Sequence, residues 1–352
     1  MHSARTGTGR SRRARLRGRF RQPAGRADLP GRFPHRHPQR CAGRRPGNEP
    51  RDRRTLRRPC RRGRRGRPAG RAVKPIVPIA LDAIRAARTR IAGTAIRSPL
   101  LPLDVPNAPA EVWVKLECLQ PIGSFKVRGA TNALALADPA AIARGVYTGS
   151  AGNMAQGLAL AARRLGVPCR VVVPDTAPGN KLEAIARLGA TSVPLPFDEW
   201  WAVLRDHGHP DEDGHFVHPV SDPAVIAGNG TVGLEIVEEL PGVRAIVVPY
   251  GGGGLSCGIA AAVGTGVPVF ASEIETAAPF AAALGAGHPV EVRHTRSFVD
   301  GIGSTSVLEE MWPLARSSLA GSAVVSVEET CAAIRMLFER GRVVAEGAGG
   351  TS

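Results

Sequence analysis

The chain has 352 residues, 47 basic and 30 acidic side chains, and a formal net charge of +17. This length is enough for a sizeable hydrophobic core, and the six cysteines show neither a CxxC pair nor metal-ligand spacing, which excludes a small disulfide-stabilised or zinc-stabilised protein. No apolar run approaches the ~18 residues needed to span a membrane, so we expect a cytoplasmic protein.

The positive charge is concentrated in residues 1–72, which hold 25 Arg, no Lys and three acidic residues. The remainder is mildly acidic, with 22 basic and 27 acidic residues. A segment dominated by Arg, Gly, Pro and Ala buries too little apolar surface to offset its ordering entropy, so we predict a disordered leader. Three interpretations of this leader compete: a nucleic-acid-binding arm, a transit peptide, and an out-of-frame translation of GC-rich DNA. Composition favours the last, and a nucleic-acid partner is not expected.

From Val73 onward, helical and strand patterns alternate along the chain. This alternation predicts an α/β fold with parallel sheets covered by helices on both faces. The predicted helices begin near Leu81 and then cover 126–136, 153–165, 181–188, 231–240, 255–263 and 328–340, while the predicted strands cover 111–116, 144–148, 169–174, 245–249 and 267–272.

The first segment whose residues could take part in catalysis is Gly123-Ser124-Phe125-Lys126, which follows a strand and opens a helix. A lysine at a helix start is unusual, because the positive end of the helix dipole disfavours another cation. The same placement lowers the pKa of an ammonium, as a Schiff-base lysine requires. An isolated lysine of this kind is usually a solvated surface residue, so the neighbouring segments decide its interpretation.

The second segment, residues 150–157 (SAGNMAQG), lies at another junction between strand and helix. Its small residues leave backbone N–H groups free to bind an anion such as a substrate carboxylate. Asn153 adds an amide donor. Taken alone, an ordinary capped helix start explains this segment better than a binding site does.

The third segment is Gly251-Gly252-Gly253-Gly254-Leu255-Ser256, again between a strand and a helix. Four consecutive glycines allow the backbone to wrap a phosphate at the helix N-terminus. The segment matches neither the dinucleotide fingerprint nor the P-loop, so a single phosphate monoester fits best. A lysine and a separate phosphate cradle together indicate pyridoxal phosphate.

These three segments, in this order, resemble the fold-type II pyridoxal-phosphate enzymes, and most closely the threonine and serine dehydratases; serine racemase and the tryptophan synthase β subunit are wider relatives. The resemblance rests on four stretches and runs from about residue 81 to 349. The stretches are LECLQPIGSFKVRGA (116–130), SAGNMAQG (150–157), HPVSDPAVIAGNGT (218–231) and VVPYGGGGLSCGIA (247–260).

The resemblance implies two open, twisted, mostly parallel sheets with the cofactor in a cleft between a large domain (73–142 and 221–352) and a small domain (143–220). It also implies a lyase that converts a small β-hydroxy amino acid, such as threonine or serine, to the 2-oxo acid and ammonia. A homodimer or larger homo-oligomer is expected.

The same resemblance implies a role for each site residue. Lys126 would form the Schiff base and move protons, Phe125 would lie beside the cofactor ring, and Asn153 would bind the phenolic oxygen. The cofactor phosphate would be bound by Gly251, Gly252, Gly253, Gly254 and Leu255, and the substrate carboxylate by Ser150, Ala151, Gly152, Asn153 and Met154.

Three departures from the family pattern affect these expectations. Met154 stands where most relatives have His, and Ala151 stands where racemases carry a proton-transferring Ser, which favours elimination over racemisation. The chain also ends at Ser352, before the family's strand that contacts the pyridine nitrogen. The alternatives are therefore a catalytically impaired, truncated protein or another reaction of the fold, racemisation or β-replacement.

No metal site is predicted. Glu273 resembles the first ligand of a cation site in some relatives, but Pro279 stands where a second carboxylate is expected, so a structural acid is favoured. His207, His209, His215 and His218 are close in sequence within an Asp/Gly-rich stretch, which indicates a solvated turn rather than a metal site.

Overall fold

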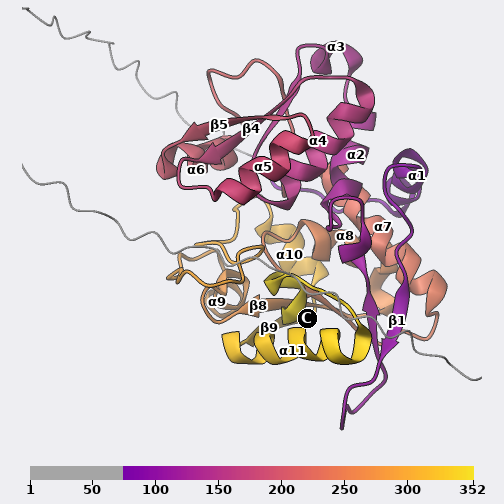
Figure 1. The fold of residues 1–352 in the computed structure, drawn as a ribbon. Coiled ribbons are helices and arrows are strands. Elements are labelled where there is room, and N and C mark those ends of the chain that lie inside the picture. Colours follow the sequence, from indigo (N-terminus) through magenta and orange to yellow (C-terminus); the bar gives the residue numbers. More distant parts are fainter. Residues whose placement is uncertain (1–73) are drawn as a thin grey trace, which may run out of the picture. The chain divides into compact units, whose positions relative to one another are not determined.

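The computed structural model describes residues 74–352, which form two parallel sheets and one antiparallel hairpin (Figure 1). The leader, with the predictions made for it, lies outside these residues. Within residues 74–352, no helix combines the length and apolar composition needed to cross a bilayer.

The first sheet has four parallel strands in the order β5-β4-β3-β6. Apolar side chains of β3 and β4 are buried against α4, whose own apolar face completes one core cluster. The bounds in this part of the chain are β3 Val146–Gly149, α4 Asn153–Leu165, β4 Cys169–Pro174, α5 Gly179–Arg187, β5 Thr191–Leu195, α6 Phe197–Arg205 and β6 His215–Phe216.

The second sheet has three parallel strands in the order β7-β8-β9. A second core cluster lies around it, and helix α11 runs along its side in Figure 1. The bounds are β7 Ile246–Pro249, α8 Gly254–Val263, η2 Gly264–Gly266, β8 Val269–Ile274, α9 Pro279–Ala286, α10 Trp312–Ser318, β9 Gly321–Val325, α11 Val327–Gly341 and η3 Gly347–Thr351.

The remaining elements precede the first sheet or link the two sheets. They are α1 Leu81–Ile91, β1 Leu100–Leu103, β2 Val112–Lys115, η1 Glu117–Leu119, α2 Lys126–Leu136, α3 Pro139–Ile142 and α7 Pro223–Glu239. Strands β1 and β2 pair antiparallel and form a separate two-stranded sheet, so the parallel pattern expected for the fold does not extend to them.

Helix α7 is the central packing element, because it contacts α1, α2 and α8. A Cβ added at Gly228 would lie 2.6 Å from the Arg128 carbonyl oxygen of α2, and one at Gly230 would lie 2.7 Å from the Gly258 carbonyl oxygen of α8. These distances are shorter than real Cβ contacts, so only glycine permits this spacing. The close approach brings α2 and α8 against the same helix.

The predicted elements agree well with the structure where their pattern is strong. The predicted bounds of α2, α4 and β4 match the observed ones. Helix α7 was predicted to begin at Thr231, but it begins at Pro223, where Asp222 caps it by accepting the Ala224 and Val225 N–H groups. The helix is buried on most sides, so it has little of the amphipathic periodicity on which the prediction depended.

Several elements were not predicted: β1, β5, β6, β9, α3, α6, α9 and α10. Most are short, and their apolar residues are too few to establish a period.

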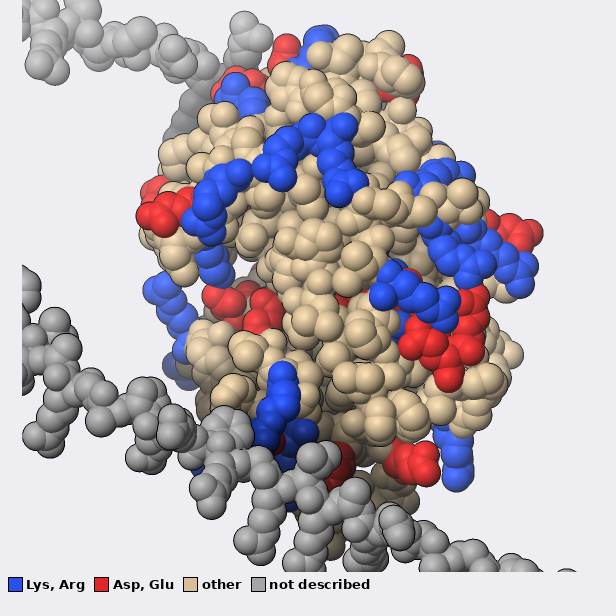
Figure 2. Space-filling view, turned by 45° about the vertical axis from the view of Figure 1, so that its right-hand side comes forward, with Lys and Arg blue, Asp and Glu red and all other residues tan. Residues whose placement is uncertain are grey.

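On the surface, a band of basic side chains crosses the upper part of the face drawn in Figure 2, and acidic and basic groups lie together lower on its right. Among the surface ion pairs, Arg88 and Arg97 both pair with Glu238.

Candidate active site

Lys126 is the first residue of α2, and its side chain is half-buried. Its Nζ donates to the Pro219 carbonyl oxygen at 2.8 Å. Burial lowers the pKa of this ammonium from 10.5 to about 8, and the nearby Glu346 carboxylate partly opposes that shift. A lysine with a lowered pKa is neutral, and therefore nucleophilic, in a larger fraction of molecules.

Phe125, the residue before Lys126, occupies the N-cap position of α2. Lys126 Nζ lies 5.4 Å from the centroid of its ring. The aromatic face therefore lies close to the amine, where a planar cofactor attached to that amine would be.

The glycine-rich segment connects the end of β7 to the start of α8. Gly253 has φ +93°, a left-handed conformation that favours glycine, and no side chain caps the helix. Within the described part of the chain, the backbone N–H groups of residues 251–256 have no hydrogen-bond acceptor. Unpaired N–H groups at a helix N-terminus form an anion-binding site, so this segment fits a phosphate group.

The segment at residues 150–157 lies between β3 and the start of α4. The Ser150 hydroxyl accepts the Gly152 N–H at 3.2 Å, while the N–H groups of Ala151, Asn153 and Met154 have no acceptor among residues 74–352. These free donors fit a carboxylate. The Met154 side chain is buried in the core beside the first sheet, so only its backbone is available to a substrate.

A turn at residues 218–221 connects the first and third segments. Its Pro219 carbonyl accepts from Lys126, and its Val220 side chain would lie only 2.7 Å from a Cβ added at Gly252. The second segment also approaches the lysine, because a Cβ at Gly157 would lie 3.0 Å from the Lys126 carbonyl carbon. All three segments are thus in contact with Lys126 or with the turn beside it.

Glu346 is a residue of this site that its local sequence does not single out. The Asn153 amide donates to both of its carboxylate oxygens, at 2.9 and 3.1 Å, and its charge acts on Lys126. It is 193 residues from Asn153 along the chain, and the only local signal is the following Gly-Ala-Gly.

The histidine-rich stretch is not the solvated turn that was predicted. His218 is buried, and His207 is half-buried and bonds Glu310 at 3.1 Å. The prediction failed because the sequence does not reveal that Glu310, far along the chain, bonds His207, or that the His218 ring is enclosed and bonds the Leu204 carbonyl of α6. Glu273 is also buried, and it accepts the Phe280 N–H, the Ala281 N–H and the Ser322 hydroxyl.

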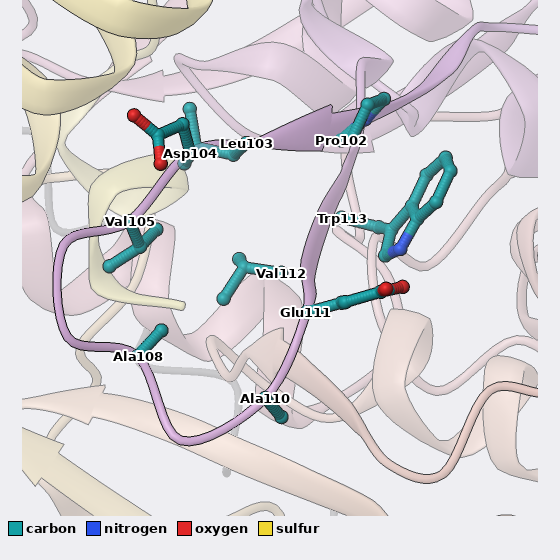
Figure 3. Close-up of a pocket in the computed structure, with 9 residues that line it drawn as sticks. All are labelled: Pro102, Leu103, Asp104, Val105, Ala108, Ala110, Glu111, Val112 and Trp113. Atoms are coloured by element: carbon teal, nitrogen blue, oxygen red, sulfur yellow. The ribbon is translucent and has the colours of Figure 1, made fainter.

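A surface hollow of about 620 Å³ lies at the β1–β2 hairpin rather than beside Lys126 (Figure 3). Its lining comes from the two strands and the loop between them, including Asp104, Glu111 and Trp113. No lysine or glycine cradle lines it, so it is not the candidate active site.

Comparison with known proteins agrees with this geometry. The family model "Pyridoxal-phosphate dependent enzyme" matches residues 91–352. The chain is 41% identical to the L-threonine ammonia-lyase of Thermotoga maritima over 246 residues, which is 68% of this chain and 61% of that protein. It is 35% identical to the catabolic L-threonine dehydratase of Escherichia coli over 280 residues, 78% of this chain and 85% of that protein.

Solved structures show the same fold. Maize serine racemase matches with a TM-score of 0.73 and 30% identity, over 78% of this chain and 85% of that one. The threonine deaminase of tomato (Solanum lycopersicum), in its processed isoform 2, matches with a TM-score of 0.68 and 30% identity, over 80% and 82%. The chain spans about three fifths of the length of the Thermotoga relative.

The family match, the relatives and a half-buried lysine connected through the 218–221 turn to an anion-binding glycine segment agree with one another. The chain belongs to the family of pyridoxal-phosphate dependent enzymes.

Proposed function

We propose that this chain is an ammonia-lyase that eliminates the β-hydroxyl of a small amino acid such as threonine or serine, giving the 2-oxo acid and ammonia. The observation that carries the proposal is the position of Lys126, half-buried at the start of α2 and connected through the 218–221 turn to the glycine segment. The relatives named as threonine ammonia-lyases and dehydratases support the choice of substrate.

Residues of all three segments would hold the cofactor. Lys126 would attach it, with the Phe125 ring alongside. The Asn153 amide, which in this structure donates to Glu346, would donate to the phenolic oxygen of the cofactor instead. The N–H groups of Gly251 to Gly254 and of Leu255 would bind its phosphate. When bound, pyridoxal phosphate supplies an electron sink for negative charge at the substrate α-carbon.

The chain's own residues would then bind the substrate and move its protons. The free N–H groups of Ala151, Asn153 and Met154, with Ser150 and Gly152 shaping the loop, would orient the carboxylate. Lys126 Nζ would accept the α-proton, and a pKa of about 8 keeps part of the amine neutral near neutral pH.

Racemisation is a second candidate, because serine racemases are among the structural neighbours. It requires a proton donor on the second face of the cofactor, and Ala151 has none. An enzyme that produced D-serine from L-serine faster than it released ammonia would favour this candidate.

The test compares Lys126→Ala with Lys74→Ala, an exposed lysine near the start of the described residues. Wild type and Lys74→Ala should show the visible absorbance of a lysine-bound cofactor, and borohydride should fix the cofactor on the peptide containing Lys126. Assays of oxo acid and ammonia from L-serine and L-threonine then test the reaction. A visible band that persists in Lys126→Ala would contradict the proposed role of this lysine.

We further propose, on the resemblance, a cytoplasmic location and a homodimer or larger assembly. The division into a large domain (73–142 and 221–352) and a small domain (143–220) is part of the same proposal, and the two separate parallel sheets support it. Light scattering of the purified chain measures the assembly, and a monomeric mass would refute it.

A further inference from the structure

The turn at residues 218–221 is organised by the buried ring of His218. Nδ1 of the ring accepts the Val220 N–H at 3.1 Å and the Ser221 N–H at 2.8 Å. Nε2 lies 3.1 Å from the Leu204 carbonyl oxygen, to which it donates. One side chain therefore satisfies both amides of the turn and links the turn to α6.

The ring must be neutral to accept at Nδ1, and its surroundings keep it so. Burial, together with the neighbouring His207, lowers the pKa of His218 from 6.5 to about 3. His207 stacks on the ring with 4.5 Å between centroids, and the Glu310 carboxylate bonds His207 Nε2 at 3.1 Å. The ring is therefore fixed in one tautomer and one orientation.

A metal ion is a poorer explanation of this cluster. Ligand atoms of His207, His218 and Glu310 lie within 4.8 Å of one another, which suits a cation by distance. A ligating imidazole needs a free lone pair. The Nδ1 lone pair of His218 already receives two backbone N–H groups, and its Nε2 carries the proton donated to Leu204.

The turn contacts both Lys126 and the glycine segment of the candidate active site. The Pro219 carbonyl, next to His218, accepts from Lys126 Nζ at 2.8 Å. Val220 is adjacent to the glycine segment, since its side chain blocks a Cβ at Gly252 and its carbonyl oxygen would lie 3.0 Å from one at Gly254. A change of one or two ångströms in the turn would alter both contacts.

We propose that His218 is a positioning residue for Lys126 and for the glycine segment, acting through the two turn amides that its Nδ1 accepts. The inference depends on the proposed function only in treating Lys126 as the lysine that attaches the cofactor. The geometry of the turn does not depend on that function.

Two substitutions of similar polarity separate the two contacts of the ring. The Oδ1 of Asn occupies nearly the position of Nδ1, so His218→Asn keeps an acceptor for the turn amides and loses the bond to Leu204. The amide of Gln lies near Nε2, so His218→Gln keeps the bond to Leu204 and loses that acceptor. The proposal predicts that only His218→Gln disturbs Lys126.

The readout is the pKa of Lys126 in the full chain freed of cofactor, measured from the pH dependence of acetic anhydride labelling of its peptide by mass spectrometry. We expect about 8 in wild type and in His218→Asn. In His218→Gln it should rise by about one unit, because a loosened turn admits water and burial is the main cause of the low value. His288→Gln, at an exposed histidine, is the matched control and should match wild type.

A Lys126 pKa that rises in His218→Asn as much as in His218→Gln would overturn the proposal, and so would an unchanged pKa in a folded His218→Gln. If His218→Gln does not fold, His218→Asn decides alone: an unchanged value supports the proposal and a shifted value overturns it. The labelling uses neither cofactor nor substrate, so its result is separate from any failure of the proposed reaction.

Discussion

At the scale of single residues, the protonation state of Lys126 depends on its burial and on the charged group beside it. Lys126 is connected to the glycine segment through the 218–221 turn, and Glu346 is an acid that both contacts Asn153 and acts on Lys126. The lysine's neutral fraction is therefore set by two opposing effects, burial and the Glu346 charge.

The substitution Glu346→Gln removes that charge and keeps an oxygen that can accept from Asn153. Because the carboxylate raises the pKa of Lys126, its loss should lower this pKa below the wild-type value of about 8. Peptide labelling across pH measures the shift. Glu275→Gln is the control, because it changes an acid just after β8 that accepts the Val327 N–H at the start of α11. An unchanged or higher pKa in Glu346→Gln would show that Glu346 does not act on the lysine.

His218 should make the folded protein sensitive to acid. Its pKa is lowered from 6.5 to about 3, so between these values the unfolded chain binds a proton that the folded chain does not. The free energy of unfolding should therefore fall as the pH falls through this window, by up to about 1.4 kcal/mol per pH unit from this group. Urea unfolding of wild type and His218→Asn measures it, since this contribution is absent from the variant; a constant difference between the two would contradict the prediction.

At the scale of elements, the site exists because three helices begin close together. Helices α2 and α8 both pack against α7 through glycines, which brings the starts of these two helices close enough to share the 218–221 turn. The third helix, α4, approaches Lys126 through Gly157.

Gly230→Ala tests this packing. The added methyl group would lie 2.7 Å from the Gly258 carbonyl oxygen and 3.0 Å from Ile84, so α7 and α8 must move apart. We expect a loss of about 1–3 kcal/mol in the free energy of unfolding. Gly242→Ala, where nothing lies within 4 Å, is the control and should change it by less than about 0.5 kcal/mol. Equal effects of the two substitutions would refute the packing argument.

At the scale of the whole described unit, a buried ion network connects segments that are distant in sequence. The Arg128 guanidinium bonds Glu117 of η1 at 2.7 Å and Glu235 of α7 at 2.6 Å, and Lys115 of β2 pairs with Glu235 at 2.9 Å. Arg128 also donates to the Ile96 carbonyl oxygen. The network joins the β1–β2 region to the helices that carry the site.

Arg128→Met should be strongly destabilising, because it leaves the Glu117 and Glu235 carboxylates enclosed with less compensating charge. We expect a loss of about 3–5 kcal/mol in the free energy of unfolding. Arg85→Met removes an exposed partner of Asp82 and should cost less than about 1 kcal/mol. Chemical unfolding of the three proteins decides; similar stabilities for Arg128→Met and wild type would show that the network contributes little.

The sequence by itself predicts the motifs of the candidate site and the fold class. The glycine run, the lysine at a helix start and the small residues of 150–157 are local features, and the alternation of strands and helices fixes the fold class, because backbone conformation and periodicity depend on neighbours in the chain.

The tertiary structure alone decided which groups meet. It placed Glu346 beside Asn153, enclosed His218 under His207 and Glu310, made α7 longer than its pattern indicated, and set the pKa of Lys126. Burial and charge depend on atoms that come close only after folding, so no stretch of sequence carries them by itself.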